Sequence, residues 1–161
     1  MQRELVELRV RGVILGSPDG SPYVVLEDRG RCHRLELPIG PFEASAIIVE
    51  LEGIAPPRPL THDLLADIFR DAGFSLDAVV LSESADGGAR ARLEYSKGAR
   101  CLERDVRPSD AIALALRLGV RIAADRALVE SAAVPPAPPL QERRKPRILI
   151  LEDWKERAVG A

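Results

Sequence analysis

Two short segments of the sequence hold side chains that can exchange protons, bind phosphate or ligate a metal ion. The first is Arg58-Pro59-Leu60-Thr61-His62-Asp63, and the second is Asp105-Val106-Arg107-Pro108-Ser109-Asp110. An imidazole exchanges protons near neutral pH because its unperturbed pKa is about 6.5. Carboxylates are ligands for divalent cations, and a guanidinium can hold a phosphate through two parallel hydrogen bonds. These residue types together suit the hydrolysis of a phosphodiester bond.

The first segment lies at the start of a predicted helix over residues 61–72. Thr61 is predicted to be the N-cap, because its hydroxyl can accept a hydrogen bond from an otherwise unpaired helix amide. His62 and Asp63 then belong to the first turn, where they can bind a divalent ion or transfer a proton. A structural role is the alternative: Asp63 complements the helix dipole and His62 hydrogen-bonds a neighbouring strand. The residue types alone leave both interpretations open.

The second segment joins the end of a predicted strand to the start of a predicted helix. Strand alternation places Asp105 and Arg107 on the face opposite Val106, and Ser109 can cap a helix that begins with Asp110. Carboxylates at a strand end and a helix start could converge on one ion, with Arg107 holding a phosphate. The alternative is an ion pair between Arg107 and an aspartate that only holds the loop in place.

The elements that must position these segments follow a repeated order. Alternating apolar residues predict strands, and apolar residues at i, i+3, i+4 and i+7 predict helices. Three strands and a helix are predicted over 5–15, 23–27, 33–39 and 44–51, and the same order recurs over 76–81, 89–95, 100–106 and 111–118. Further helices are predicted over 61–72 and 125–132. The predicted fold class is therefore α+β, with internally duplicated β-β-β-α units and an additional helix after each.

The duplication relates acidic residues in the two units. Glu43 and Asp110 are both followed by an alanine at the start of the fourth element, so they are predicted to occupy equivalent positions. A pseudo-twofold arrangement of the two units would bring these helix starts into comparable places. Glu43 is therefore a further candidate for the site.

The composition predicts one cytoplasmic domain. With 161 residues, 46% of them hydrophobic, the chain can bury a core without disulfides or metals. The formal net charge of -2 gives no global positive field for nonspecific binding of nucleic acid. Cys32 and Cys101 form no CxxC motif and are expected to be reduced thiols. No apolar stretch approaches the roughly 20 residues that span a bilayer, so we expect no membrane segment.

The chain changes character near its C-terminus, so we place the folded domain at 1–133 and a tail at 134–161. Residues 134–146 are rich in proline and charge, which favours an extended, solvated linker. The densest basic run of the chain lies here, at Arg143, Arg144, Lys145 and Arg147. Residues 147–154, RILILEDW, could add a strand to a sheet edge or to a partner subunit.

Three motifs in order resemble the bifunctional nuclease domain family, which is named for activity on both RNA and DNA. They are Leu37-Pro38-Ile39-Gly40 with Glu43-Ala44, Arg58-Pro59-Leu60-Thr61-His62-Asp63-Leu64, and Asp105-Val106-Arg107-Pro108-Ser109-Asp110-Ala111-Ile112-Ala113-Leu114-Ala115. The resemblance covers roughly residues 4–132, and Val106 stands where the family usually has a smaller residue. It implies a compact α+β fold and a nuclease whose matched polar positions are Glu43, His62, Asp63, Asp105, Arg107 and Asp110.

From these positions we hypothesise hydrolysis of RNA or DNA with a divalent metal. Asp105, Asp110 and Asp63 would hold Mg²⁺ or Mn²⁺, which lowers the pKa of a bound water. Arg58 and Arg107 would position the phosphate, and His62 would transfer the proton. The alternative is a non-enzymatic, homo-oligomeric binding or regulatory module that uses the same polar loops at an interface or a ligand pocket.

Overall fold

The structure of the chain is a computed structural model that describes residues 4–16 and 20–132. The described residues form one seven-stranded sheet and four helices, which confirms the predicted α+β class. The strands are β1 (Leu5–Ile14), β2 (Tyr23–Glu27), β3 (Arg34–Pro38), β4 (Ser75–Glu83), β5 (Ala89–Lys97), β6 (Arg100–Val106) and β7 (Ile122–Asp125). The helices are α1 (Pro41–Leu51), α2 (Thr61–Asp71), α3 (Pro108–Leu118) and α4 (Arg126–Ser131).

The order of the strands is β3-β2-β1-β7-β4-β5-β6, so two antiparallel meanders flank β7. Strand β7 pairs antiparallel with β1 and parallel with β4, and thereby joins the two halves into one sheet. The sequence did not predict β7, because its four residues are too few to display alternation. The proposed internal duplication stays a prediction, since strand order alone does not establish it.

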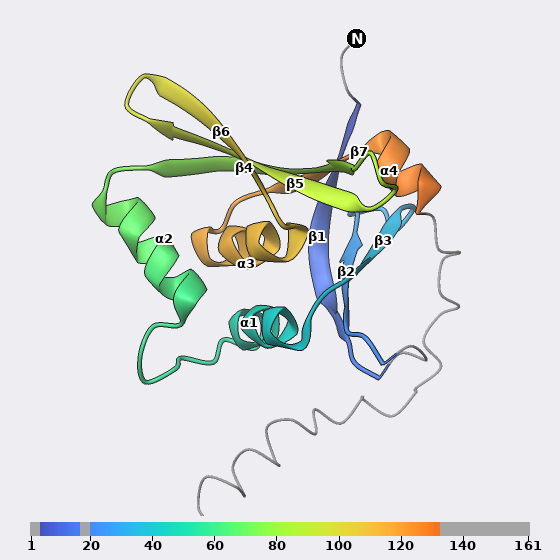
Figure 1. Cartoon of the computed structure of the whole chain (residues 1–161), viewed down its shortest axis with the longest axis horizontal. Helices are drawn as coiled ribbons and strands as arrows, with labels where there is room; N and C mark the ends of the chain where they lie inside the picture. The colour runs from blue at the N-terminus through green and yellow to red at the C-terminus, as the bar shows by residue number, and fades with distance from the viewer. Residues whose placement is uncertain (1–3, 17–19, 133–161) are drawn as a thin grey trace, which may run out of the picture.

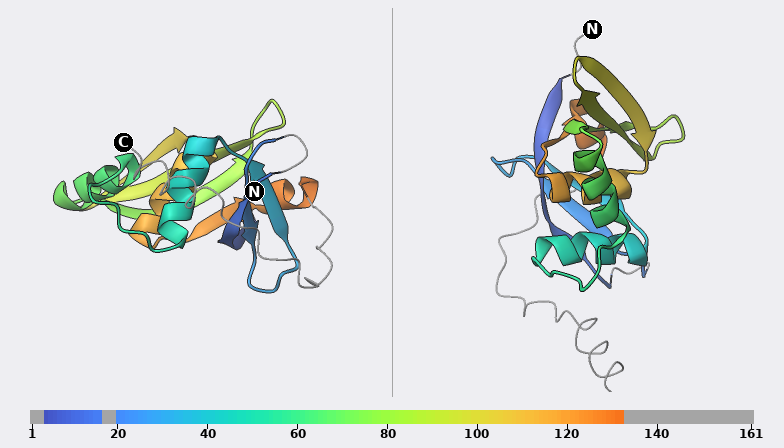
Figure 2. Two further views of the ribbon diagram at one scale, coloured as in Figure 1. Left: turned by 90° about the horizontal axis from the view of Figure 1, so that it is seen from below. Right: turned by 90° about the vertical axis from the view of Figure 1, so that its left-hand side faces the viewer.

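Helices α1 and α3 lie side by side on one face of the sheet (Figures 1 and 2). Strands β1 to β3 cross β4 to β6 steeply, and the strongly twisted sheet curves around these two helices. Helix α2 lies at the margin of this layer, beside α3 and farther from the strands. The first turns of α1, α2 and α3 are therefore free to approach one another on the same side of the sheet.

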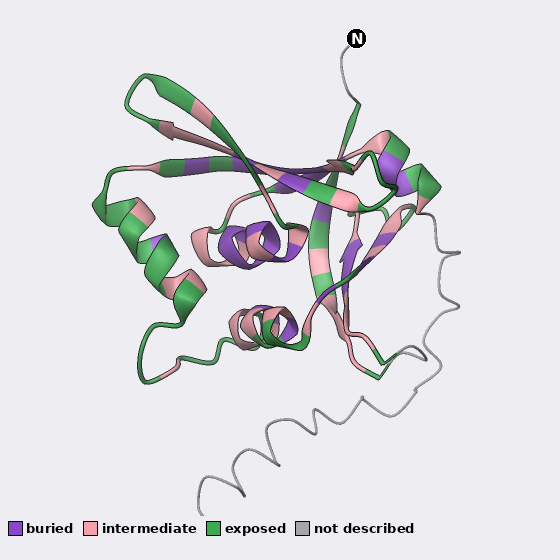
Figure 3. Cartoon of the chain, viewed as in Figure 1, coloured by how far each residue is buried: buried purple, intermediate pink, exposed green. Residues whose placement is uncertain are grey.

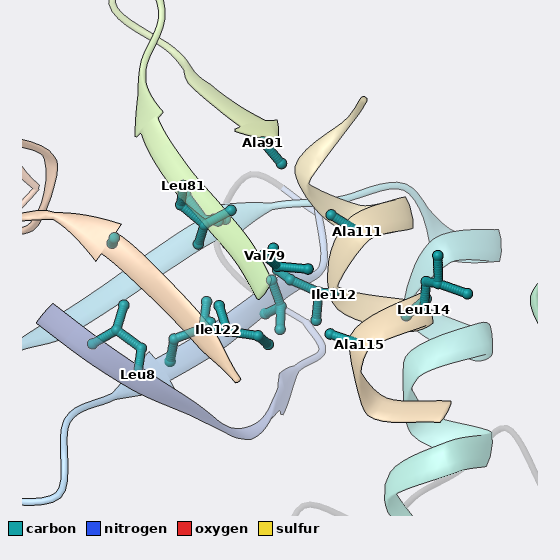
Figure 4. Packing of buried hydrophobic residues seen from close by; sticks show 14 of the residues in the cluster. Leu8, Val79, Leu81, Ala91, Ala111, Ile112, Leu114, Ala115 and Ile122 are labelled. Carbon is teal, nitrogen blue, oxygen red and sulfur yellow. The ribbon is translucent and has the colours of Figure 1, made fainter. Parts of the chain in front are cut away.

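The core is centred on α3, which the sheet and the neighbouring helices cover (Figure 3). Ile112 and Ala115 of α3 point toward Val79 of β4 and Ile122 of β7 (Figure 4), and all four side chains are buried. Full burial of a side chain such as Ile or Val contributes about 1.5–3 kcal/mol relative to exposure. Apolar packing thus fixes α3 firmly on the sheet.

Helix α2 starts at Thr61 as predicted, whereas α1 and α3 start three residues before the predicted 44 and 111. Helices α1 and α3 begin at Pro41 and Pro108, because proline lacks the amide that the first turn leaves unpaired and its φ already suits a helix. The predicted N-caps of α2 and α3 were wrong, whereas Asp125 is the N-cap of α4 as predicted. Thr61 is the first residue of α2 and Leu60 its N-cap, while Ser109 lies buried inside the first turn of α3.

Two further expectations concern the membrane and the tail. Among the helices of the described residues, none is both long and apolar enough to cross a bilayer. The predicted tail at 134–161 lies outside the described residues, as does the boundary at 133/134.

Candidate functional site

The two predicted segments meet in space at the first turns of α2 and α3. The Nε2 atom of His62 lies 3.2 Å from Oδ1 of Asp110, although 48 positions separate them in the sequence. The imidazole is largely covered and the carboxylate is partly open to solvent. An imidazole–carboxylate pair of this kind orients the ring and fixes which of its nitrogens can exchange a proton.

Arg107 adds a guanidinium to this pair and connects it to the start of α1. Its Nε and Nη2 donate to the two oxygens of Asp110, at 2.8 and 3.1 Å, and Nη1 donates to Oε1 of Glu43 at 3.0 Å. These contacts use three of its five N–H groups. The side chain is nevertheless 67% exposed, so the other two N–H groups are open to a ligand.

Gly40 allows Glu43 to take this position. A Cβ atom built at Gly40 would collide with Oε2 of Glu43, so a larger residue would force this side chain to shift. We name the four side chains of Glu43, His62, Arg107 and Asp110 the polar cluster. It joins one residue of the first motif, one of the second and two of the third.

The polar cluster keeps Asp110 ionised. Burial of the Asp110 carboxyl opposes ionisation, but the hydrogen bonds from Arg107 and His62 outweigh it and lower its pKa. The same contacts, first to Asp110 and then to Glu43, raise the pKa of Arg107. An ionised carboxylate can only accept, so Nε2 of His62 is the donor in their bond and Nδ1 carries the free lone pair.

Asp63 turns away from the polar cluster. Its Oδ2 accepts from the Leu60 amide at 2.8 Å, and its Oδ1 accepts from Nε of Arg117. Burial again opposes ionisation, but the bonds from Arg117 and Leu60 outweigh it and lower the pKa of Asp63. Both oxygens are thus engaged in holding the first turn of α2.

Arg117 is a residue of the site region that the sequence analysis did not single out. Its side chain is 3% exposed and also donates to the carbonyls of Ala113 and Ala46, at 3.0 and 3.2 Å. It therefore links α1, α2 and α3. The available signal was a single charge in the otherwise apolar run at 111–118.

Asp105 and Arg58 do not join the polar cluster. Asp105 pairs across the sheet with Arg92, whereas its neighbour Val106 pairs with Ala91 on the helix-covered side. Asp105 therefore faces the opposite side of the sheet, where it is 69% exposed and lies 3.4 Å from Nη2 of Arg90. Arg58 is exposed and makes no hydrogen bond or ion pair with another described residue.

The carboxylates do not form the predicted metal site. Asp63, Asp105 and Asp110 point to Arg117, Arg90 and Arg107, respectively. Within residues 4–16 and 20–132, no group of three His, Cys, Asp or Glu side chains is placed to hold a metal ion. This geometry does not fit the three-carboxylate site that we predicted.

A cleft of about 730 Å³ adjoins the polar cluster, and Arg107 and Glu43 belong to its lining. The other walls come from β3, the turn between β4 and β5, the first turn of α3, and α4. Clefts of about 300–1,000 Å³ are typical of ligand sites. The exposed guanidinium therefore stands at the border of a cavity of useful size.

A comparison with models of known protein families identifies the family of this chain. A model described as the bifunctional nuclease domain matches residues 24–137, which include the whole polar cluster. The chain belongs to the bifunctional nuclease domain family. This confirms the resemblance found in the three motifs.

The chain is also similar to two proteins of Mycobacterium tuberculosis. It is 36% identical over 128 residues to "Uncharacterized protein MT1877" of strain CDC 1551 / Oshkosh and to "Uncharacterized protein Rv1829" of strain ATCC 25618 / H37Rv. Each alignment covers 80% of this chain and 76% of the relative. The similarity thus extends over most of the bifunctional nuclease domain.

Proposed function

We propose that this protein is a nuclease that hydrolyses phosphodiester bonds in RNA or DNA at the polar cluster. One observation carries the proposal: in a member of the bifunctional nuclease domain family, Asp110 binds both His62 and the exposed Arg107. A proton-transfer group and a phosphate-binding group thus share one carboxylate. Such a shared partner fixes their relative positions before substrate arrives.

His62 is the proton-transfer group in this proposal. Because Nε2 donates to Asp110, Nδ1 is left to accept a proton, and it has no hydrogen-bond partner among the described residues. The nucleophile, which is water or a ribose hydroxyl, gives its proton to Nδ1 while its oxygen forms a bond to phosphorus. The bond from phosphorus to the leaving oxygen breaks, and that oxygen then takes the proton from the imidazolium.

Arg107 positions the phosphate. Its two open N–H groups can bind two phosphate oxygens while the other three keep their bonds to Asp110 and Glu43. This one guanidinium faces two carboxylates, those of Asp110 and Glu43.

The test is cleavage of labelled single-stranded RNA and DNA by the purified full-length chain. We expect His62→Gln to reduce cleavage at least 100-fold, since a positioned proton-transfer group contributes about 10²–10⁴-fold. Asp110→Asn and Arg107→Lys should also reduce cleavage, because Asp110 holds both groups in place and Arg107 binds the phosphate. Asp105→Asn, on the opposite face of the sheet, is the matched control and should retain activity. Equal activity in wild type and Asp110→Asn would show that another site or a contaminant cleaves the substrate.

Metal dependence remains a separate prediction for the same assay. Activity with Mg²⁺ or Mn²⁺ that EDTA abolishes would support a metal held by fewer protein ligands than we predicted, completed by substrate oxygens and water. Activity that persists in EDTA would support the side-chain mechanism alone.

A homo-oligomeric binding module is the second candidate, and an apolar surface on α2 favours it. Leu64, Leu65 and Ile68 are exposed on the outer side of this helix, together with Leu60 just before it. Clustered apolar side chains on a surface mark contact sites for other proteins. Light scattering of the wild-type chain and of a Leu64→Glu/Ile68→Glu variant tests this. An oligomeric wild type and a monomeric variant, together with no cleavage activity in the wild type, would favour the binding module.

A further inference from the structure

Strand β3 gives the cleft an unpaired sheet edge. In the described part of the chain, β3 pairs with β2 alone and ends one side of the sheet. Six consecutive residues from 35 to 40 line the cleft, so the backbone edge itself faces it. An open edge offers amides and carbonyls on which an extended segment can form a further strand.

The chain leaves its described part at this same cleft. Ser131 ends α4, and both it and Ala132 contribute to the cleft lining. Residues 133–146 then precede the apolar segment at 147–154. Even at about 3.1 Å per residue, these 14 residues can span about 40 Å, so the segment is tethered within reach of β3.

The chemistry of the segment complements that of the cleft. Residues 148–151 are Ile-Leu-Ile-Leu, which suit a strand against apolar neighbours such as Leu37 and Ile39. Basic residues stand directly before them, at Arg143, Arg144, Lys145 and Arg147. Glu36, Glu43 and Glu83 line the cleft, and the side chain of Glu83 makes no hydrogen bond or ion pair with another described residue.

From these observations we propose that residues 147–154 bind in the cleft of their own chain as an added strand along β3. The basic run would lie near the cleft carboxylates, which adds a salt-dependent attraction. If the proposed nuclease function holds, the bound segment also regulates it, because Arg107 and Glu43 border the same cleft. The docking itself does not depend on that function.

Trp154 provides a direct readout, because it is the single tryptophan of the sequence. In the full-length chain we expect a blue-shifted emission and at least a threefold lower acrylamide quenching constant than in an Ile148→Asp/Ile150→Asp variant. Glu83→Lys should also raise the acrylamide quenching constant of Trp154, because it replaces a cleft carboxylate with a positive charge. Leu64→Asp/Ile68→Asp is the control for docking on α2 and should leave Trp154 unchanged. Equal quenching in wild type and in the tail variant would overturn the proposal.

The native cysteines at the two sheet edges give a second test. Cys32 precedes β3 by two residues, whereas Cys101 lies on β6 at the other edge, and both are exposed and free. In Arg147→Cys and Trp154→Cys variants under mild oxidation, at least one should form a disulfide within the chain to Cys32 and not to Cys101. The preferred variant gives the direction of the strand.

The other outcomes identify other occupants and would overturn the proposal. Disulfides between chains that increase with protein concentration would show that a second copy occupies the cleft. Protection of Trp154 that appears only after single-stranded RNA is added would show that the basic run binds nucleic acid. Neither assay measures cleavage, so the proposed nuclease function and the docking can fail independently.

Discussion

Helices α2 and α3 have the same length and are held in opposite ways. Each has 11 residues, but α3 buries six of them and α2 buries Ala66 alone. Sheet, α1 and α2 surround α3 (Figures 1 and 3). Helix α2 bonds to α3 through His62 and Asp63 and packs Phe69 against the core, but it leaves Leu64, Leu65 and Ile68 exposed. Apolar packing positions Asp110, while polar contacts position His62, the other half of the pair.

The largest expected difference concerns one isoleucine on each helix. Ile112→Ala removes a fully buried side chain from α3 and should lower the free energy of unfolding by about 2–5 kcal/mol. Ile68→Ala on α2 removes a side chain that is 52% exposed and should change it by about 0.5 kcal/mol or less. Urea unfolding of both variants measures the two values. A large loss in Ile68→Ala would mean that α2 is packed against a partner.

The next effect tests whether polar contacts hold α2. Arg117→Ala leaves the Asp63 carboxylate and the Ala113 and Ala46 carbonyls without their donor. We expect a loss of about 2–3 kcal/mol in urea unfolding, somewhat below a fully buried pair because Asp63 is partly exposed. The exposed Arg70→Ala should cost about 1 kcal/mol or less. Similar losses in both variants would contradict the special role of Arg117.

A smaller effect concerns pH. The pKa of Asp63 is lowered in the folded protein, so its contribution to stability is present above the ordinary value near 3.8 and is lost as pH falls through the folded value. Wild type should therefore be more stable than Asp63→Asn at pH 7, and the difference should shrink below about pH 4. Thermal unfolding from pH 7 to pH 3 measures it. A difference independent of pH would rule out the ionised pair as its source.

The smallest effect is expected on the exposed face of the sheet. Asp105 lies near Arg90 with both side chains at least half exposed, and such pairs contribute about 0–1 kcal/mol. Asp105→Asn should therefore leave unfolding nearly unchanged, and 0.5 M NaCl should not alter that result. A loss comparable to that of Arg117→Ala would place Asp105 in a network that this geometry does not contain.

Periodicity predicted the elements because strands and helices repeat locally. Six of the seven strands and helices α1, α2 and α3 lie where alternation or i, i+3, i+4 spacing indicated them. Alternation also placed Asp105 opposite Val106, which is the side away from the helices. The same alternation argues against the hypothesis that Asp105 and Asp110 converge, because Asp110 lies on a helix on the other side of the sheet.

The buried side of α2 could not be predicted in the same way. Helical spacing in 61–72 indicates Leu65, Ile68 and Phe69 as inward residues. Phe69 does pack against the core, but Leu65 and Ile68 are exposed. His62 and Asp63 face inward because their partners stand 48 and 54 positions later in the sequence. Contacts between residues so far apart in the sequence produce no periodic pattern, so the periodicity of 61–72 could not indicate which side of α2 faces α3.

The central place of β7 sets the order in which the molecule can be completed. Leu5 of β1 is paired with Asp125 of β7, so the middle of the sheet joins residues from nearly opposite ends of the described chain. On a ribosome, both meanders emerge before the strand that unites them. Closing so long a loop is slow relative to local contacts. Until β7 is in place, the edges of β1 and β4 that pair with it stay unpaired. We therefore expect the insertion of β7 to be the final folding step.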